Sequence, residues 1–195
     1  MPGTPEDASA GGSPDYLAPY ADAVRAHGAT FEATLWASKE KQVGRFAVIA
    51  EMADLTGRVI VDMVRAGAAR GLPEARFETV DFASDTECFE RLARSDGVDL
   101  VVFSGSLNTF EPEHAFGVAK EAFRHAREGV VFNFLSSRNH ERHAINPAPA
   151  KRFDPASMLD RALTLTPRVR FRQDYFDGHD ATIAMMHSER VRTRG

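Results

Sequence analysis

The chain has 195 residues, of which 43% are hydrophobic and 27% charged, and its formal net charge is −4. This composition is typical of a soluble α/β protein, and the length suffices for one domain with a full core. A slightly acidic chain lacks the positive field that attracts nucleic acid, so we expect no nucleic-acid partner. The single cysteine, Cys88, cannot form an internal disulfide, and no secretory signal or membrane span is recognisable. We therefore expect a protein of the reducing cytoplasm.

Two terminal stretches differ in composition from the rest of the chain. Residues 1–14 are rich in Gly, Pro, Ser and Ala and have no hydrophobic periodicity, which is typical of a disordered tail. Residues 189–195 are basic, and we expect a loose tail there as well. One α/β domain is therefore expected over residues 15–188.

Two helices are predicted ahead of the first strand. Apolar residues at helical spacing predict the first over residues 16–26, and Gly28 ends it. The second is predicted over residues 31–51, with a break expected at Ser38 or Gly44. Its polar residues read as a solvated face unless they serve a site.

Beyond residue 57, short apolar runs alternate with amphipathic segments, which indicates a parallel sheet covered by helices. The predicted strands are 58–62, 76–82, 98–103, 130–135, 169–175 and 180–187. The predicted helices are 63–71, 85–94 (capped by Ser84 or Asp85), 111–127 and a short helix through Leu163 opened by Asp154 or Pro155. Asp177-Gly178 is a hairpin signal between the last two strands. We predict a three-layer, Rossmann-like α/β fold whose mostly parallel sheet ends in an antiparallel hairpin.

The order of these segments resembles that of the class I S-adenosylmethionine-dependent methyltransferases, over about residues 16–187. The resemblance rests on residues 35–46, 103–108 and 129–136, and on Asp174-Tyr175 near the terminal hairpin. It implies transfer of a methyl group from S-adenosylmethionine to an acceptor, which we expect to be a small molecule. In that family the first strand ends on an acidic residue and leads into a glycine-rich turn. The acidic residue that ends the following strand then holds the cofactor ribose.

The glycine-rich turn and that following strand are both absent between Asp62 and Met63. Residues 63–71 look like the helix that comes after them in the family. We expect a further segment of about 30 residues at this point, the size of a βαβ unit, in preference to a genuine deletion. A chain without the segment still has enough residues at 63–75 for a right-handed crossover, but its first strand would be poorly covered.

The resemblance suggests cofactor-binding roles for three acidic or aromatic positions. Asp62 would orient the methionine end of the cofactor; its alternative role is the N-cap of the next helix. Asp81 and Phe82 lie where the family reads adenine, through a carboxylate and a backbone amide. Their alternative role is to end the strand ahead of the next helix.

A small-residue turn follows the strand at 98–103. The turn residues that would line the mouth beside the transferable methyl are Ser104, Gly105, Leu107 and Asn108. The alternative is an ordinary strand-to-helix turn.

Three residues ahead of the first strand belong to a helix that can cover the site, namely Trp36, Gln42 and Arg45. Arg45 would pair with the cofactor carboxylate, and Trp36 would form a wall of the pocket. Trp36 is otherwise a core anchor, and the polar residues are otherwise a solvated face.

No catalytic residue is assigned from the sequence. Methyl transfer depends mainly on alignment, and a base helps only where the acceptor must lose a proton. Asn108, His140 and Tyr175 are candidates among which we make no choice. His140 and His143 flank Glu141, which is a metal-ligand pattern without a fourth ligand, so we expect a surface loop and no metal.

Two functions remain open at this stage. The first is a methyltransferase that acts on an unidentified small acceptor. The second is a catalytically inactive relative that serves as a binding or assembly module. A nicotinamide-dependent oxidoreductase shares the layered architecture, but the sequence lacks its glycine fingerprint. No feature of the sequence indicates the oligomeric state.

Overall fold

The computed structural model describes residues 22, 25–26, 38–62, 82, 85, 87–140 and 150–188. The chain divides into two units, residues 1–35 and residues 36–195. In the first unit the described residues are helical, in agreement with the helix predicted over 16–26. The predictions for both tails, and for the helix and strand between residues 63 and 81, lie outside the described residues. The proposed interruption after Asp62 therefore stays a prediction.

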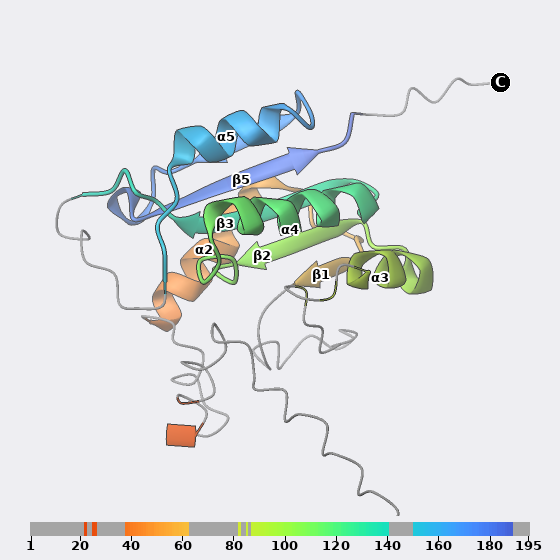
Figure 1. Ribbon diagram of the computed structural model, residues 1–195, viewed down its shortest axis with the longest axis horizontal. Helices are drawn as coiled ribbons and strands as arrows, with labels where there is room; N and C mark the ends of the chain where they lie inside the picture. The colour runs from red at the N-terminus through yellow and green to blue at the C-terminus, as the bar shows by residue number, and fades with distance from the viewer. Residues whose placement is uncertain are drawn as a thin grey trace, which may run out of the picture. The chain divides into compact units, whose positions relative to one another are not determined.

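The second unit is built on a mixed sheet of five described strands in the order β1-β2-β3-β5-β4 (Figure 1). The strands are β1 (Ile60–Asp62), β2 (Leu100–Ser104), β3 (Gly129–Leu135), β4 (Val169–Arg172) and β5 (Asp180–Met186). β1, β2 and β3 are parallel, whereas β5 runs antiparallel to both β3 and β4. The predicted mostly parallel sheet with an antiparallel terminal hairpin is confirmed.

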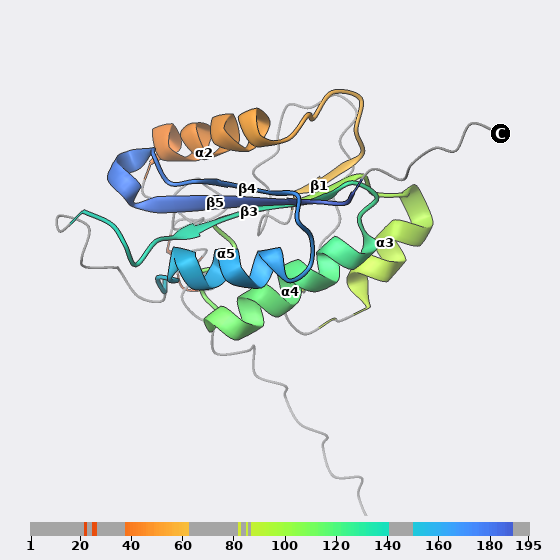
Figure 2. The same ribbon diagram turned by 90° about the horizontal axis from the view of Figure 1, so that it is seen from above.

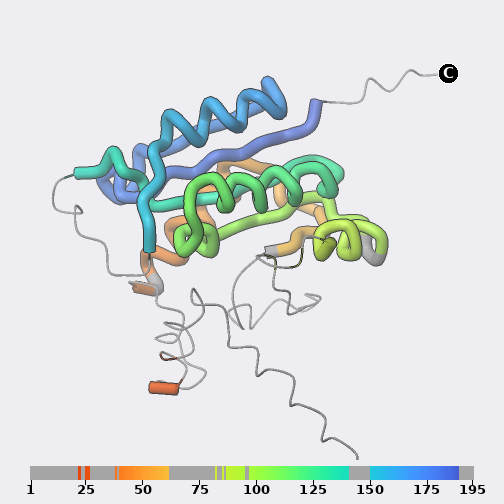
Figure 3. The backbone as a smooth tube through the Cα atoms, in the orientation of Figure 1, coloured from red at the N-terminus to blue at the C-terminus, as the bar shows by residue number. Residues whose placement is uncertain are grey.

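Helices cover both faces of this sheet (Figure 2). On one face lies α2 (Lys39–Met52), and on the other lie α3 (Cys88–Asp96), α4 (Pro112–His125) and α5 (Pro155–Leu163). The path of the backbone, from α2 through β1 to the hairpin, can be followed in Figure 3. This unit therefore has the predicted three-layer, Rossmann-like α/β fold.

The apolar face of α2 packs against the central strands. Val48, Ile49 and Met52 of the helix form one buried cluster with strand residues, which are Leu100, Val102, Val131 and Ala184. Burying an aliphatic side chain of this size contributes about 1.5–3 kcal/mol, so the cluster fixes α2 firmly on the sheet. The long apolar runs of β2 and β3 are buried along their whole length, because helices cover them from both sides.

The helix boundaries follow local hydrogen bonds. α2 begins after Ser38, whose side chain accepts a hydrogen bond from the Lys41 amide. The part of the predicted helix over residues 31–37 lies outside the described residues, so the break expected ahead of α2 stays a prediction. Gly44 lies inside the helix and does not break it. The predicted start of α3 at Asp85 is wrong by three residues. Asp85 instead accepts a hydrogen bond from the Glu87 amide and pairs with Arg91, and the helix begins at Cys88.

The starts of α4 and α5 agree with the sequence. Pro112 occupies the first turn of α4, and Asp154 caps α5 by accepting a hydrogen bond from the Ser157 amide. The hairpin strands are shorter than predicted, because a 3₁₀ turn at Phe176–Gly178 joins them and β4 ends at Arg172.

Two glycines offer a test of this packing. A Cβ atom on Gly129, at the start of β3, would lie 2.1 Å from the Met185 carbonyl oxygen of the neighbouring strand. Gly129→Ala is therefore expected to lower the free energy of unfolding by about 1–3 kcal/mol. Gly117 is exposed on α4 with open space around it, and Gly117→Ala is expected to raise the free energy of unfolding by about 0.5–1 kcal/mol. Urea unfolding measures both; equal midpoints would contradict the described register.

Candidate functional site

The carboxyl ends of the three parallel strands lie at one edge of the sheet. Asp62 at the end of β1 is in register with Val102, and Ser104 at the end of β2 is in register with Asn133 of β3. Ligands of open α/β sheets bind just beyond such strand ends. We refer to this place, defined by the ends of β1, β2 and β3, as the carboxyl edge.

The turn after β2 is held in place by backbone and side-chain hydrogen bonds. Gly105 has a φ of 74°, which suits glycine, and its amide donates to Asn133 Oδ1 at 2.5 Å. Asn108 is buried and tied to the segment that precedes α5. Its side-chain Nδ2 donates to the Lys151 carbonyl oxygen at 2.8 Å, and the backbone carbonyl oxygen of Asn108 accepts from the Lys151 amide. Leu107 is buried as well.

A row of polar side chains crosses the sheet at this level. Ser104, Asn133 and Thr182 are paired in register on β2, β3 and β5. Since side chains alternate along a strand, these three share the face of Val102 and Val131, which α2 covers. Their exposed fractions are 2%, 1% and 0%. We call Ser104, Asn133 and Thr182 the polar row.

Part of the polar row has no hydrogen-bond partner among the described residues. Ser104 Oγ and Asn133 Nδ2 are buried and unpaired within this part of the chain, and so is Ser106 Oγ in the adjoining turn. By contrast, the Thr182 hydroxyl is hydrogen-bonded to the Tyr175 hydroxyl. A buried polar atom without a partner costs about 1–3 kcal/mol, and native proteins contain few. Three such atoms beside one turn indicate that a ligand or ordered water completes the site.

A buried ion pair lies next to the polar row. Arg45 of α2 holds both carboxylate oxygens of Asp180 at the start of β5, and the Asp180 side chain is only 1% exposed. His179 Nε2 lies 3.9 Å from the same carboxylate. In this structure the Arg45 guanidinium thus faces Asp180, and its proposed contact with a cofactor carboxylate stays a prediction.

Tyr175 keeps its proton in this environment. Burial raises the pKa of the phenol well above its ordinary value, and the nearby Asp180 carboxylate raises it further. A tyrosine with a raised pKa is a hydrogen-bonding group rather than a base at neutral pH. Tyr175 therefore serves here as a partner of Thr182.

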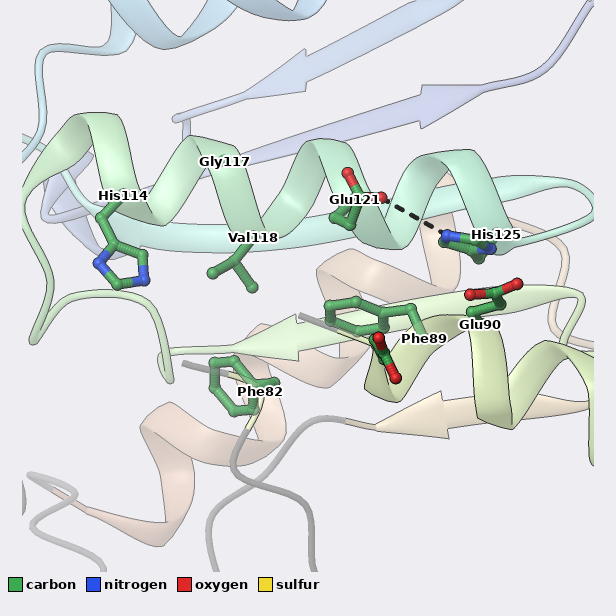
Figure 4. A pocket seen from close by; sticks show the side chains of 9 residues that line it. Phe82, Phe89, Glu90, His114, Gly117, Val118, Glu121 and His125 are labelled. Carbon is green, nitrogen blue, oxygen red and sulfur yellow. Dashed lines mark ion pairs between the residues drawn. The ribbon is translucent and has the colours of Figure 1, made fainter. Parts of the chain in front are cut away.

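Phe82 lies on the opposite face of the sheet from the polar row. Its ring meets those of Phe103 and Phe110 edge-on, with centroids 5.6 and 6.1 Å apart. It lines a cavity of about 470 Å³ between α3 and α4, together with His114, Glu121 and other residues of the two helices (Figure 4). Phe82 and the polar row are thus separated by the sheet.

The structure describes only some of the other predicted site residues. Gln42 is half-buried on α2, and Asp62 is described by its backbone alone. Trp36 and Asp81 lie outside the described residues, as do Glu141 and His143. Among the described residues, His, Cys, Asp and Glu side chains form no group of three that can hold a metal ion. The described helices include none long and apolar enough to cross a membrane.

The sequence analysis did not identify three residues of the site. Asn133 is the one polar residue in the apolar run of β3, and that position was the available signal. Asp180 and Thr182 were read only as parts of a strand. Nothing in their spacing indicates a partner in α2, because Arg45 and Asp180 are 135 positions apart.

Comparison with known proteins gives few matches. No family model and no curated protein matches the chain. A solved O-methyltransferase family protein from Burkholderia thailandensis is 16% identical; the alignment covers 57% of this chain and 35% of that chain, with a TM-score of 0.41. The methyltransferase domain of bacterial CtHen1 is 14% identical; the alignment covers 48% of this chain and 55% of that chain, with a TM-score of 0.36. The chain therefore spans about a third to a half of the length of these two solved chains.

The ion pair generates a stability prediction. Arg45→Met removes both hydrogen bonds of the guanidinium to the buried Asp180 carboxylate, leaves His179 Nε2 at 3.9 Å as its remaining neighbour, and is expected to lower the free energy of unfolding by about 3–5 kcal/mol. Adding Asp180→Asn should restore part of the loss. Arg172→Met removes exposed ion pairs with Glu51 and Asp174 and should have a much smaller effect. Equal losses in the two arginine variants would contradict the buried pair.

Cys88 generates a pH prediction. Burial raises the pKa of its thiol to about 11 from an ordinary value of 9.0. The unfolded chain therefore ionises first, so the stability that the neutral thiol contributes is complete below pH 9.0 and lost as the pH rises to about 11. The free energy of unfolding should fall more over this window than in Cys88→Ala. Parallel profiles for the two proteins would contradict burial of the thiol.

Proposed function

We propose that this chain binds S-adenosylmethionine at the carboxyl edge and transfers its methyl group to a small acceptor. The observation that carries the proposal is the small-residue turn at 104–108, which follows β2 directly beside the end of β1. This is where a doubly wound sheet binds ligands. The resemblance in the order of the elements supports the choice of cofactor.

The residues at the carboxyl edge suit the methionine end of this cofactor. Gly105 brings backbone close to the edge without a side chain, and the unpaired Ser104 and Ser106 hydroxyls can serve polar groups of a ligand. We propose Asp62, Ser104 and Gly105 as binding residues there, and the Asp81 carboxylate and the Phe82 backbone amide at the adenine. The Phe82 ring itself packs against Phe103 and Phe110 on the other face of the sheet. When bound, the cofactor supplies a methyl group activated on a sulfonium.

The chain's own contribution to the reaction is alignment and exclusion of water. α2 covers the face that carries the polar row, so the three side chains of the row are shielded from bulk solvent. Among the described groups beside the row, Tyr175 stays protonated and Asp180 is held by Arg45. We therefore propose that a positioned acceptor, rather than a strong base of this region, accounts for catalysis.

The proposal is tested by calorimetry of the full chain with S-adenosylmethionine and with its demethylated product, S-adenosylhomocysteine. We expect saturable binding of both, with dissociation constants below about 1 mM. Absence of heat with either compound at that concentration would overturn the proposal. Binding without methyl transfer to any acceptor would instead identify an inactive binding module.

A glycine pair locates the binding. Gly105→Ala places a side chain at a positive φ in the proposed site and should weaken S-adenosylhomocysteine binding by about tenfold or more, equivalent to about 1.4 kcal/mol. Gly57→Ala is the matched control, because Gly57 has a φ of 65° and open space around it in the turn before β1. Equal affinities for the two variants would place the ligand elsewhere.

A further inference from the structure

Strand β4 has β5 on one side and no described strand on the other. The Met186 amide of β5 donates to the Arg168 carbonyl oxygen, and the two strands then pair residue by residue. Because backbone groups alternate in direction along an antiparallel strand, those of Arg170 point toward β5. The N–H and C=O groups of Val169 and Phe171 therefore point outward, and no described residue forms a hydrogen bond with them there. An open strand edge of this kind is a template for pairing with another chain.

The side of this edge that faces α5 is apolar. Figure 2 shows β4 and β5 between α2 on one side and α5 on the other. A cavity of about 240 Å³ lies on the α5 side, and its lining residues are Pro155, Ala156 and Leu159 of α5, with Arg138, Phe171 and Gln173. The volume is below the range of about 300–1,000 Å³ that is usual for small-molecule sites. A side chain of a longer partner therefore fits it better than a free ligand does.

Large apolar side chains are exposed on the same side. The described residues expose four of them, and two lie here: Phe171 is 38% exposed, and Leu163, one turn beyond Leu159 on α5, is 51% exposed. The Arg138 charge in the cavity wall is balanced by Asp154. The α5 side therefore favours apolar side chains of a partner.

The side of the edge that faces α2 is basic. Side chains alternate along a strand, so Arg170 and Arg172 point to the α2 side and away from the cavity. Arg172 is paired with Glu51 and Asp174. Arg170 donates to the neutral Met52 carbonyl oxygen, and no carboxylate of a described residue forms an ion pair with it. The α2 side therefore favours an acidic side chain of a partner.

A second copy of this chain does not fit this edge. Two-fold symmetry would pair two β4 strands antiparallel, through the outward groups of odd-numbered residues, with even-numbered residues opposite one another. In every register centred on a residue from 168 to 172, an arginine then lies directly opposite an arginine of the other copy, because residues 168, 170 and 172 are all arginine. Like charges directly opposite one another on a sheet are destabilising.

We propose that the outer edge of β4 binds an extended acidic segment of a partner protein as an additional strand. Its main chain pairs with the outward groups of Val169 and Phe171. Apolar side chains of the segment lie toward α5 and enter the cavity, and acidic side chains lie toward α2 and meet Arg170. The inference is independent of the proposed function, because the edge lies on the far side of β5 from the parallel strands.

The proposal is tested with labelled heptapeptides and the full chain, by fluorescence anisotropy. The probe is Glu-Leu-Glu-Val-Glu-Leu-Glu, in which acidic and apolar residues alternate. One control replaces each Glu by Lys, and the other keeps the composition without the alternation, as Glu-Glu-Leu-Val-Leu-Glu-Glu. We expect a dissociation constant below about 100 μM for the probe and at least about tenfold weaker binding of both controls. No binding of the probe, or equal binding of either control, would overturn the proposal.

Main-chain pairing is tested without altering the protein. Two forms of the probe carry N-methyl groups, one on the apolar residues and one on the glutamates. Only alternate amides of an added strand face β4, so one form should bind at least about tenfold more weakly than the other. Equal affinity of the two forms would overturn pairing along the edge.

A charge reversal tests the basic side of the edge. Arg170→Glu should weaken binding of the acidic probe at least about tenfold and strengthen binding of the lysine peptide. Arg124→Glu is the matched control, because it changes the net charge equally at an exposed position on α4. Equal effects of the two variants would overturn the proposal. The peptide comparisons decide the question even if Arg170→Glu does not fold.

Amide resonances of the labelled chain locate the binding. The probe should shift the outward amides of Val169 and Phe171 more than the Arg170 amide, which faces β5. Shifts confined to α3 and α4 would overturn the proposal. Shifts of the same two amides with protein concentration alone would show that a second copy occupies the edge, and would overturn it as well.

Discussion

The constraint on which the site depends is the burial of polar side chains at the end of an otherwise hydrophobic sheet. Two residues before the polar row, Val102 and Val131 pack under α2 and contribute to the core. At the row itself the same face carries Ser104 and Asn133, whose polar atoms are as buried as those aliphatic groups. Such a change from apolar to polar under one helix lowers stability unless another group satisfies the polar atoms. It is therefore a feature that function explains better than folding does.

The sheet order accounts for where this feature lies. Parallel pairing of β1, β2 and β3 brings their carboxyl ends to one edge. Because β5 runs antiparallel to β3, it is the first residues of β5, including Asp180 and Thr182, that lie at this edge. Arg45 reaches Asp180 from α2, so the pair joins the covering helix to the sheet beside the polar row. Hydrophobic contacts of Met52 and Ile49 fix the same helix further along. The position of α2 over the row is thus determined by two independent sets of contacts.

Much of the fold could be predicted from residue patterns, because the patterns are local. The runs at β2 and β3 are short, apolar and bounded by glycine or polar turns, and Pro112 and Asp154 mark helix starts. The predicted start of α3 was three residues too early, because the Asp85 carboxylate accepts hydrogen bonds from the Glu87 amide and from Arg91 instead of capping the helix. The candidate site was predicted in part: Ser104 and Gly105 lie at the carboxyl edge, whereas Asn133 and Asp180 were missed. Their roles depend on register and on a partner distant in sequence, which no spacing reveals.

The central claim is that a ligand of the S-adenosylmethionine type binds at the carboxyl edge on the side of the turn after β2. The most direct measurement is a titration of the isotope-labelled chain with S-adenosylhomocysteine, followed through assigned backbone amide resonances. The account predicts saturable shifts of Gly105 and Ser106, with the resonance of Gly57 unchanged. Shifts confined to α3 and α4, or no shift at saturating concentrations, would contradict it.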